Sequence, residues 1–139
     1  MRLVIDTNIL VSALLAATSL PAQLVVLWRA GQFDLLTTAD QLDELMRVTR
    51  YPKIRERLAP AVAGRLVNDL RALATTLDNL PVVEVTYDPD DNYLLALAVA
   101  GAADFLVTGD KRDLLGIAVY EGTKIITVRN FLAKYGQAP

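Results

Sequence analysis

An aspartate near the start of the chain stands where open α/β sheets bind their ligands. Leu3, Val4 and Ile5 form a short apolar run that favours a strand buried on both faces. The run stops at Asp6, and a helical pattern begins a few residues later. Ligands of open α/β sheets bind outside the carboxyl ends of the strands. Asp6 is therefore a candidate functional residue, with capping of the following helix as the alternative role.

Further acidic residues occur at similar junctions along the chain. They are Glu44, Asp88, Asp90, Asp91, Asp110 and Asp113. Asp6 and Asp110 both follow apolar strands, and these strands end at the same edge of the sheet if they are parallel. Several carboxylates held together cannot all stay ionised unless a cation compensates them. Because carboxylate oxygens suit Mg²⁺ or Mn²⁺, these residues predict an acidic metal site.

The chain has no histidine and no cysteine, which excludes the usual zinc sites, Ser-His-Asp triads and Cys-His pairs. An enzyme with this sequence must use carboxylates, lysine, tyrosine or an oxygen-ligated metal. A metal-activated water needs no histidine, and two metals about 4 Å apart stabilise both the attacking and the leaving oxygens of a phosphodiester. Asn8 and Thr108 are candidates to add a neutral oxygen or to orient a ligand water. The alternative for each is a turn or cap role.

The basic residues are unevenly distributed. The formal net charge of −2 does not by itself indicate a nucleic-acid binder. Five of the fourteen basic residues nevertheless fall within positions 47–57, namely Arg47, Arg50, Lys53, Arg55 and Arg57. Such a run is commonly a solvated face. Because it follows Glu44 directly, it is also a candidate edge for contacts with nucleic-acid phosphates.

Length and composition predict one globular domain, residues 1–139, with its own apolar core. The absence of cysteine fits a reducing cytoplasm. Residues 9–17 faintly resemble a signal peptide, but Asp6 and Asn8 interrupt the pattern. No apolar run approaches the ~20 residues that span a bilayer. We therefore expect a cytoplasmic protein without a membrane segment.

The alternation of strands and helices predicts a three-layer α/β fold with a mostly parallel sheet of about five strands. The expected strands are residues 3–5, 33–37, 82–85, 105–108 and 124–128. The expected helices are residues 8–17, 21–30, 39–49, 60–77, 88–99 and 130–135, with a short basic turn or helix after Tyr51-Pro52. The helix at 88 begins with three carboxylates, whereas a cap needs only one side chain.

Four motifs occur along the chain in a characteristic order. They are Ile5-Asp6-Thr7-Asn8, Glu44-Leu45, Asp88-Pro89-Asp90-Asp91-Asn92 and Val107-Thr108-Gly109-Asp110-Lys111-Arg112-Asp113. In order and approximate spacing they resemble the PIN-domain nucleases, most closely the VapC-like toxin components of toxin–antitoxin pairs. The resemblance covers essentially the whole chain.

The resemblance implies a set of site residues. The family's acidic quartet maps onto Asp6, Glu44, Asp91 and Asp110, with Asp113 as an accessory acid and with Asn8 and Thr108 as supporting residues. Asp90 competes with Asp91 for the third place. Asp91 is preferred because it has the family's spacing to the apolar helix that follows.

The resemblance also implies a Mg²⁺- or Mn²⁺-dependent endoribonuclease that forms a homodimer and is covered by a small antitoxin protein. The candidate contacts to its RNA substrate are Arg47, Arg50, Lys53 and Arg55. One alternative is a catalytically silent PIN-like protein that acts through partner proteins or RNA. Another is a haloacid-dehalogenase-type phosphatase, which needs a second aspartate where this chain has Asn8, and asparagine cannot transfer the proton.

Overall fold

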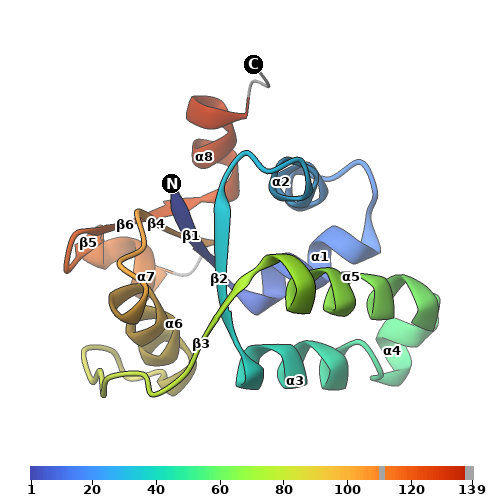
Figure 1. Ribbon diagram of the computed structural model, residues 1–139, viewed down its shortest axis with the longest axis horizontal. Helices are drawn as coiled ribbons and strands as arrows, with labels where there is room; N and C mark the ends of the chain where they lie inside the picture. Colours follow the sequence, from blue (N-terminus) through green and yellow to red (C-terminus); the bar gives the residue numbers. More distant parts are fainter. Residues whose placement is uncertain (110–111, 137–139) are drawn as a thin grey trace.

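The computed structural model describes residues 1–109 and 112–136, which form a three-layer fold with a sheet in the middle (Figure 1). The sheet has six strands in the order β3-β2-β1-β4-β6-β5. These are β1 (Arg2–Ile5), β2 (Asp34–Thr38), β3 (Thr75–Leu77), β4 (Phe105–Thr108), β5 (Val119–Tyr120) and β6 (Thr123–Thr127). Only β5 pairs antiparallel within these described residues. The predicted three-layer α/β fold with a mostly parallel sheet is confirmed, with six strands in place of five.

Helices cover both faces of the sheet. They are α1 (Thr7–Leu15), α2 (Leu20–Arg29), α3 (Ala39–Val48), α4 (Pro52–Arg55), α5 (Pro60–Leu73), α6 (Pro89–Ala100), α7 (Arg112–Ile117) and α8 (Val128–Tyr135). Leu3 and Ile5 of β1 belong to the core that includes residues of α1, α2, α3, α5 and α8. Val4, between them, packs on the opposite side with α6 and α7. This alternation follows from the two-residue period of a strand, and it confirms that β1 is buried on both faces.

The helices α1 and α2 pack against the first of these two cores. Ser19 caps α2, since its side chain accepts a hydrogen bond from the Ala22 amide. In the part of the chain that the structure describes, no single helix is long and apolar enough to cross a membrane. The pair α1 and α2 reaches that length and composition together, but it is bent by 101° at its break.

Two predictions on the β3 side of the sheet are wrong. The helix predicted for residues 60–77 ends at Leu73, because Ala74 is extended and the β-branched Thr75 and Thr76 pair with β2 as β3. The strand predicted for residues 82–85 is not a strand in the structure. The edge of β2 is already occupied by β3, and Val82 is left 86% exposed.

Two short elements were missed, and one helix begins earlier than predicted. The helix α7 and the two-residue strand β5 are too short to give a periodic pattern. The closing helix α8 begins at Val128, since the Thr127 side chain accepts a hydrogen bond from the Asn130 amide and acts as its cap.

Aromatic packing joins α8 to the centre of the sheet. The Phe131 ring is fully buried, and its centroid lies 5.6 Å from that of Phe105 on β4 and 5.8 Å from that of Phe33. Both contacts are edge-to-face, an arrangement that aromatic rings prefer. The helix α8 therefore supports β4, the strand that ends at Thr108.

We expect Phe131→Ala to lower the free energy of unfolding by about 3–5 kcal/mol, because it leaves a cavity between α8 and β4. Arg129→Ala, an exposed change in the same helix, is the control and should stay within about 0.5 kcal/mol of the wild type. Urea denaturation measures both. A loss below about 1 kcal/mol for Phe131→Ala would contradict this packing.

Candidate active site

Asp6 lies where β1 pairs with β4 at the carboxyl edge of the sheet. Its backbone amide donates to the Val107 carbonyl over 3.0 Å, which extends the pairing of the two strands by one residue. One carboxylate oxygen accepts the Thr108 hydroxyl at 3.1 Å, and the other accepts the Asn8 amide at 3.1 Å and caps α1. Asp6 is 4% exposed. The cap and a role in a site therefore coexist in the same side chain.

The chain changes direction across the sheet at this point. From β1 it continues to β2 on one side, and β4 lies on the other side of β1. Such a switch of strand order opens a crevice at the carboxyl ends of parallel strands, which is where ligands of open α/β sheets bind. Asp6 and Thr108 stand at this crevice, as the sequence pattern predicts for Asp6.

Gln41 connects the end of β1 to α3. Its side-chain nitrogen donates to the Ile5 carbonyl at 2.9 Å, and its side-chain oxygen accepts the Thr37 hydroxyl at 2.6 Å. Gln41 is 2% exposed. Because Glu44 follows Gln41 by three residues, it lies on nearly the same side of α3. These hydrogen bonds therefore turn Glu44 toward Asp6.

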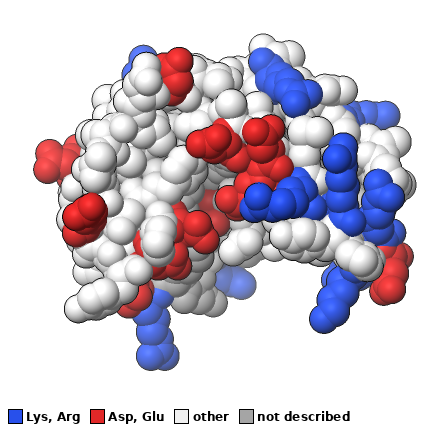
Figure 2. Space-filling model, turned by 90° about the horizontal axis from the view of Figure 1, so that it is seen from below, with Lys and Arg blue, Asp and Glu red and all other residues white. Residues whose placement is uncertain are grey.

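A small pocket, which we call the acidic notch, collects these side chains. It is lined by Asp6, Thr7, Asn8, Glu44, Asp90, Tyr93 and Leu94 and has a volume of about 70 Å³. Figure 2 shows acidic side chains gathered around a hollow on this side of the molecule. Three of the acidic positions singled out in the sequence thus line one pocket. Asp6 follows β1, Glu44 lies in α3 and Asp90 lies in α6.

At the start of α6, some residues hold the local structure and others are candidate site residues. Asp88 caps the helix by accepting the Asp90 amide at 2.9 Å. The Asn92 side chain accepts the amides of Val85 and Thr86 and holds the preceding loop. Asp90 is exposed and lines the acidic notch, whereas Asp91 on the same turn is 3% exposed.

The remaining predicted acids are Asp110 and Asp113. Asp110 lies outside the described residues. Asp113 is exposed in the first turn of α7. Within residues 1–109 and 112–136, no three acidic side chains form a group that could hold a metal ion. The donors of the notch are nevertheless all oxygens, and this chemistry suits Mg²⁺ or Mn²⁺.

Tyr93 is a notch residue that the sequence reasoning missed. Its hydroxyl forms a hydrogen bond with that of Thr38, at the end of β2. Burial, together with the negative charges of Asp40 and Glu44, raises the pKa of Tyr93 to about 12. The phenol is therefore neutral near pH 7. Its position three residues after Asp90, on the same side of α6, was the signal available in the sequence.

The basic residues predicted to contact nucleic acid follow Glu44 along the chain. Arg47, Arg50, Lys53 and Arg55 are all exposed and belong to the end of α3, the turn after it, and α4. Figure 2 shows basic side chains next to the acidic hollow. The structure thus places opposite charges on adjacent parts of one face.

The comparison with protein families agrees with this geometry. The family model for the PIN domain matches residues 2–112, and the chain therefore belongs to the PIN-domain family. PIN domains are generally nucleases and typically use divalent metals. The searches of curated proteins and of solved structures give no significant match. The family assignment leaves the phosphatase alternative without support.

We expect Asp6→Asn to leave the free energy of unfolding unchanged or slightly raised. The asparagine keeps an oxygen that caps α1, and its neutral side chain relieves repulsion from the other acids of the notch. Asp6→Ala should cost about 0.5–2 kcal/mol, because the cap is lost. Urea denaturation in EDTA compares the three proteins. An equal loss in both variants would show that the charge of Asp6 serves the fold.

We also expect the stabilisation due to Tyr93 to fall as the pH rises from 10 to 12. The folded pKa of about 12 lies above the ordinary value of 10.0, so the unfolded chain loses the phenol proton first and is favoured in this window. The measurement is the difference in unfolding free energy between the wild type and Tyr93→Phe at several pH values. A difference that stays constant up to pH 12 would show that the Tyr93 pKa is not raised.

Proposed function

We propose that this protein is a Mg²⁺- or Mn²⁺-dependent endoribonuclease and the toxin of a type II toxin–antitoxin pair. The observation that carries the proposal is the acidic notch, where Asp6, Glu44 and Asp90 meet at the carboxyl edge of a PIN-domain sheet. The neighbouring basic residues support a polyanionic substrate.

The residues proposed to hold the metal are those to which the resemblance points. They are Asp6, Glu44, Asp91 and Asp110, with Asp113 as an accessory acid. Asp90, which lines the notch, is the other candidate for the third place. A divalent cation, when bound, supplies Lewis-acid activation of the phosphodiester and of the attacking water.

The surrounding residues act on the geometry of this site. Thr108 and the Asn8 amide fix both carboxylate oxygens of Asp6, so that this side chain is oriented before any ligand arrives. Gln41 holds α3 against the end of β1 and thereby sets the position of Glu44. The exposed Asn8 side chain lines the notch and is suited to orienting a water molecule.

The partners belong to the same proposal. An RNA strand would lie over Arg47, Arg50, Lys53 and Arg55 beside the notch. A small antitoxin protein would cover the site, and the nuclease would be a homodimer in the cytoplasm, with residues 1–139 as a single PIN-like domain. The resemblance of the four sequence motifs to VapC-like toxins supports these points.

A second candidate function is a PIN-like binding protein without catalysis. The observation that favours it is the run of exposed basic residues after Glu44, which would contact RNA phosphates with or without a metal. Such a protein would bind its partner equally well with and without divalent metal.

Glu44→Gln separates the two functions. We expect the wild type to cleave a labelled single-stranded RNA in Mn²⁺ and to be inactive in EDTA, and we expect Glu44→Gln to lower the cleavage rate by more than about 100-fold. The matched control is Glu84→Gln, which makes the same change at an exposed position that does not line the acidic notch. Its rate should stay within a few-fold of the wild type.

Two results would contradict the nuclease proposal. One is cleavage that continues in EDTA, and the other is a Glu44→Gln variant that is as active as Glu84→Gln. RNA or protein binding that needs neither metal nor Glu44, without any cleavage, would favour the binding function instead.

A further inference from the structure

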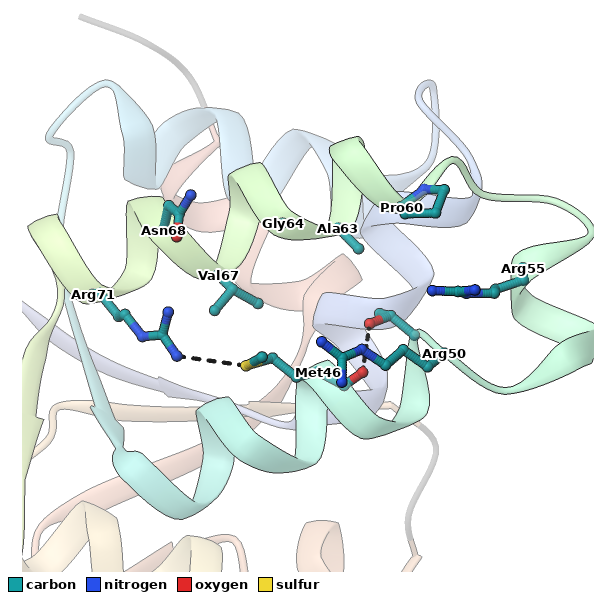
Figure 3. A pocket seen from close by; sticks show the side chains of 10 residues that line it. Met46, Arg50, Arg55, Pro60, Ala63, Gly64, Val67, Asn68 and Arg71 are labelled. Atoms are coloured by element: carbon teal, nitrogen blue, oxygen red, sulfur yellow. Dashed lines mark hydrogen bonds between the residues drawn. The ribbon is translucent and has the colours of Figure 1, made fainter.

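A second pocket lies between α3, α4 and α5, on the other side of α3 from the acidic notch (Figure 3). Its volume is about 170 Å³. It is lined by Met46, Thr49, Arg50, Arg55, Pro60, Ala63, Gly64, Val67, Asn68 and Arg71. We call it the basic pocket, because three of these side chains are arginines and none is acidic.

The three arginines come from separate elements and lie along the length of the pocket, with Arg55 and Arg71 toward opposite ends (Figure 3). Arg50 follows the end of α3, Arg55 ends α4, and Arg71 lies in the last turn of α5. Within the described residues, the one ion pair joins Arg29 to Asp69, so none of these three guanidinium groups is part of an ion pair. Like charges gathered around a small space repel one another, and an anion bound there would relieve the repulsion.

The guanidinium groups are also available to donate hydrogen bonds. Arg71 makes a long contact of 3.5 Å with the Met46 sulfur, a weak acceptor, as Figure 3 shows. The guanidinium groups of Arg50 and Arg55 donate to no acceptor in the part of the chain that the structure describes, although their backbone amides do. Planar guanidinium groups bind phosphate oxygens through paired hydrogen bonds, which makes a phosphate the best-matched anion.

The shape of the pocket depends on α5. Gly64 lies within this helix, where glycine is less favourable than alanine, and a Cβ atom built there would meet nothing within 4 Å. The absence of a side chain at Gly64 thus leaves open space on the pocket wall. The N-terminus of α5 has no side-chain cap, and its first residue, Pro60, lines the same pocket, which adds the positive end of a helix dipole to the arginines.

We propose that the basic pocket binds a backbone phosphate of the RNA strand on which the acidic notch acts. This inference rests on the proposed function. The volume of about 170 Å³ equals that of roughly five to six water molecules at ~30 Å³ each. This is a space for a phosphate and its immediate substituents rather than for a folded partner.

The helix α3 connects the two places. It presents Glu44 to the acidic notch and Thr49, its C-cap, to the basic pocket, and the helical rise separates these residues by about 7.5 Å along the axis. A shallow groove lined by Arg47, Arg50 and Tyr51 lies on the exposed side of α3 between them. An RNA strand that crosses this groove can reach both the acidic notch and the basic pocket. Asp43 also lines the groove and disfavours phosphates there, so the basic pocket is the better place for one.

Binding of RNA without metal tests the basic pocket separately from cleavage. The probe is a labelled single-stranded RNA of ten nucleotides, and its affinity for the full chain is measured in EDTA between 50 and 200 mM salt. We expect Arg71→Gln to weaken binding about 3- to 10-fold and to lower the salt slope by about 0.7, the contribution of one phosphate contact to a single strand. The matched control is Arg65→Gln, which removes the same charge from an exposed position of α5 outside the pocket. Its affinity should be unchanged.

Gly64→Leu tests the space rather than the charge. The leucine side chain fills the pocket, and it favours the helix more than glycine does, so the melting temperature should not fall. We expect RNA binding to weaken although no charge is removed. Titration with inorganic phosphate identifies the source of the phosphate. The inference would be overturned if free phosphate binds but the RNA affinity is the same in the wild type, Arg71→Gln and Gly64→Leu. The pocket would then be a site for a small anion.

The results also distinguish this inference from the proposed function. Cleavage that depends on Glu44, together with RNA affinity that is unaffected by Arg71→Gln and Gly64→Leu, would leave the nuclease standing and overturn the phosphate pocket. RNA binding that depends on Arg71 in a protein that never cleaves RNA in Mn²⁺ would support the pocket and contradict the nuclease. A wild type that does not bind RNA at all would overturn the phosphate pocket.

Discussion

The parallel pairing of β1 with β4 is the constraint on which the site depends. It fixes Asp6 beside Thr108, and the Asp6 carboxylate then receives hydrogen bonds from Thr108 on β4 and from the first turn of α1. A carboxylate that is 4% exposed loses most of its hydration, and these donors compensate part of that cost. The other acids of the notch are brought to this fixed point by separate elements. The sheet thus fixes the position of the acidic site, and the helices contribute its other carboxylates.

The elements predicted from sequence are those whose side chains repeat a simple period over several residues. β1 and β4 are buried on both faces, and their continuous apolar runs are visible in the sequence. The end of α5 and β3 could not be predicted in this way. Leu73 and Leu77 keep helical spacing, but pairing of Thr75 and Thr76 with β2 outweighs that local pattern. Tertiary contacts of this kind cannot be recognised from a short stretch of sequence.

The candidate site likewise contains residues that the sequence could indicate and residues that it could not. Asp6 was identified by its place after a buried strand and Glu44 by the resemblance of the motifs, and the structure brings both to the acidic notch. Gln41 and Tyr93 act through partners 36 and 55 residues away in the sequence, Ile5 and Thr38 respectively. A single sequence contains no information on such pairings. For Gln41, the available indication was its place beside the apolar stripe of α3, because a buried polar group needs hydrogen-bond partners.

The net charge of −2 conceals a separation of charge about α3. One side of this helix contributes Glu44 to a notch of acids, and its C-terminal end contributes to a pocket of arginines. The acids would repel a nucleic acid on their own, and the arginines would bind one without any means of acting on it. Placed about one and a half turns of helix apart, the two groups can act on different phosphates of one strand. Local charge along one helix, rather than the charge of the whole chain, is therefore what fits this PIN domain to a polyanion.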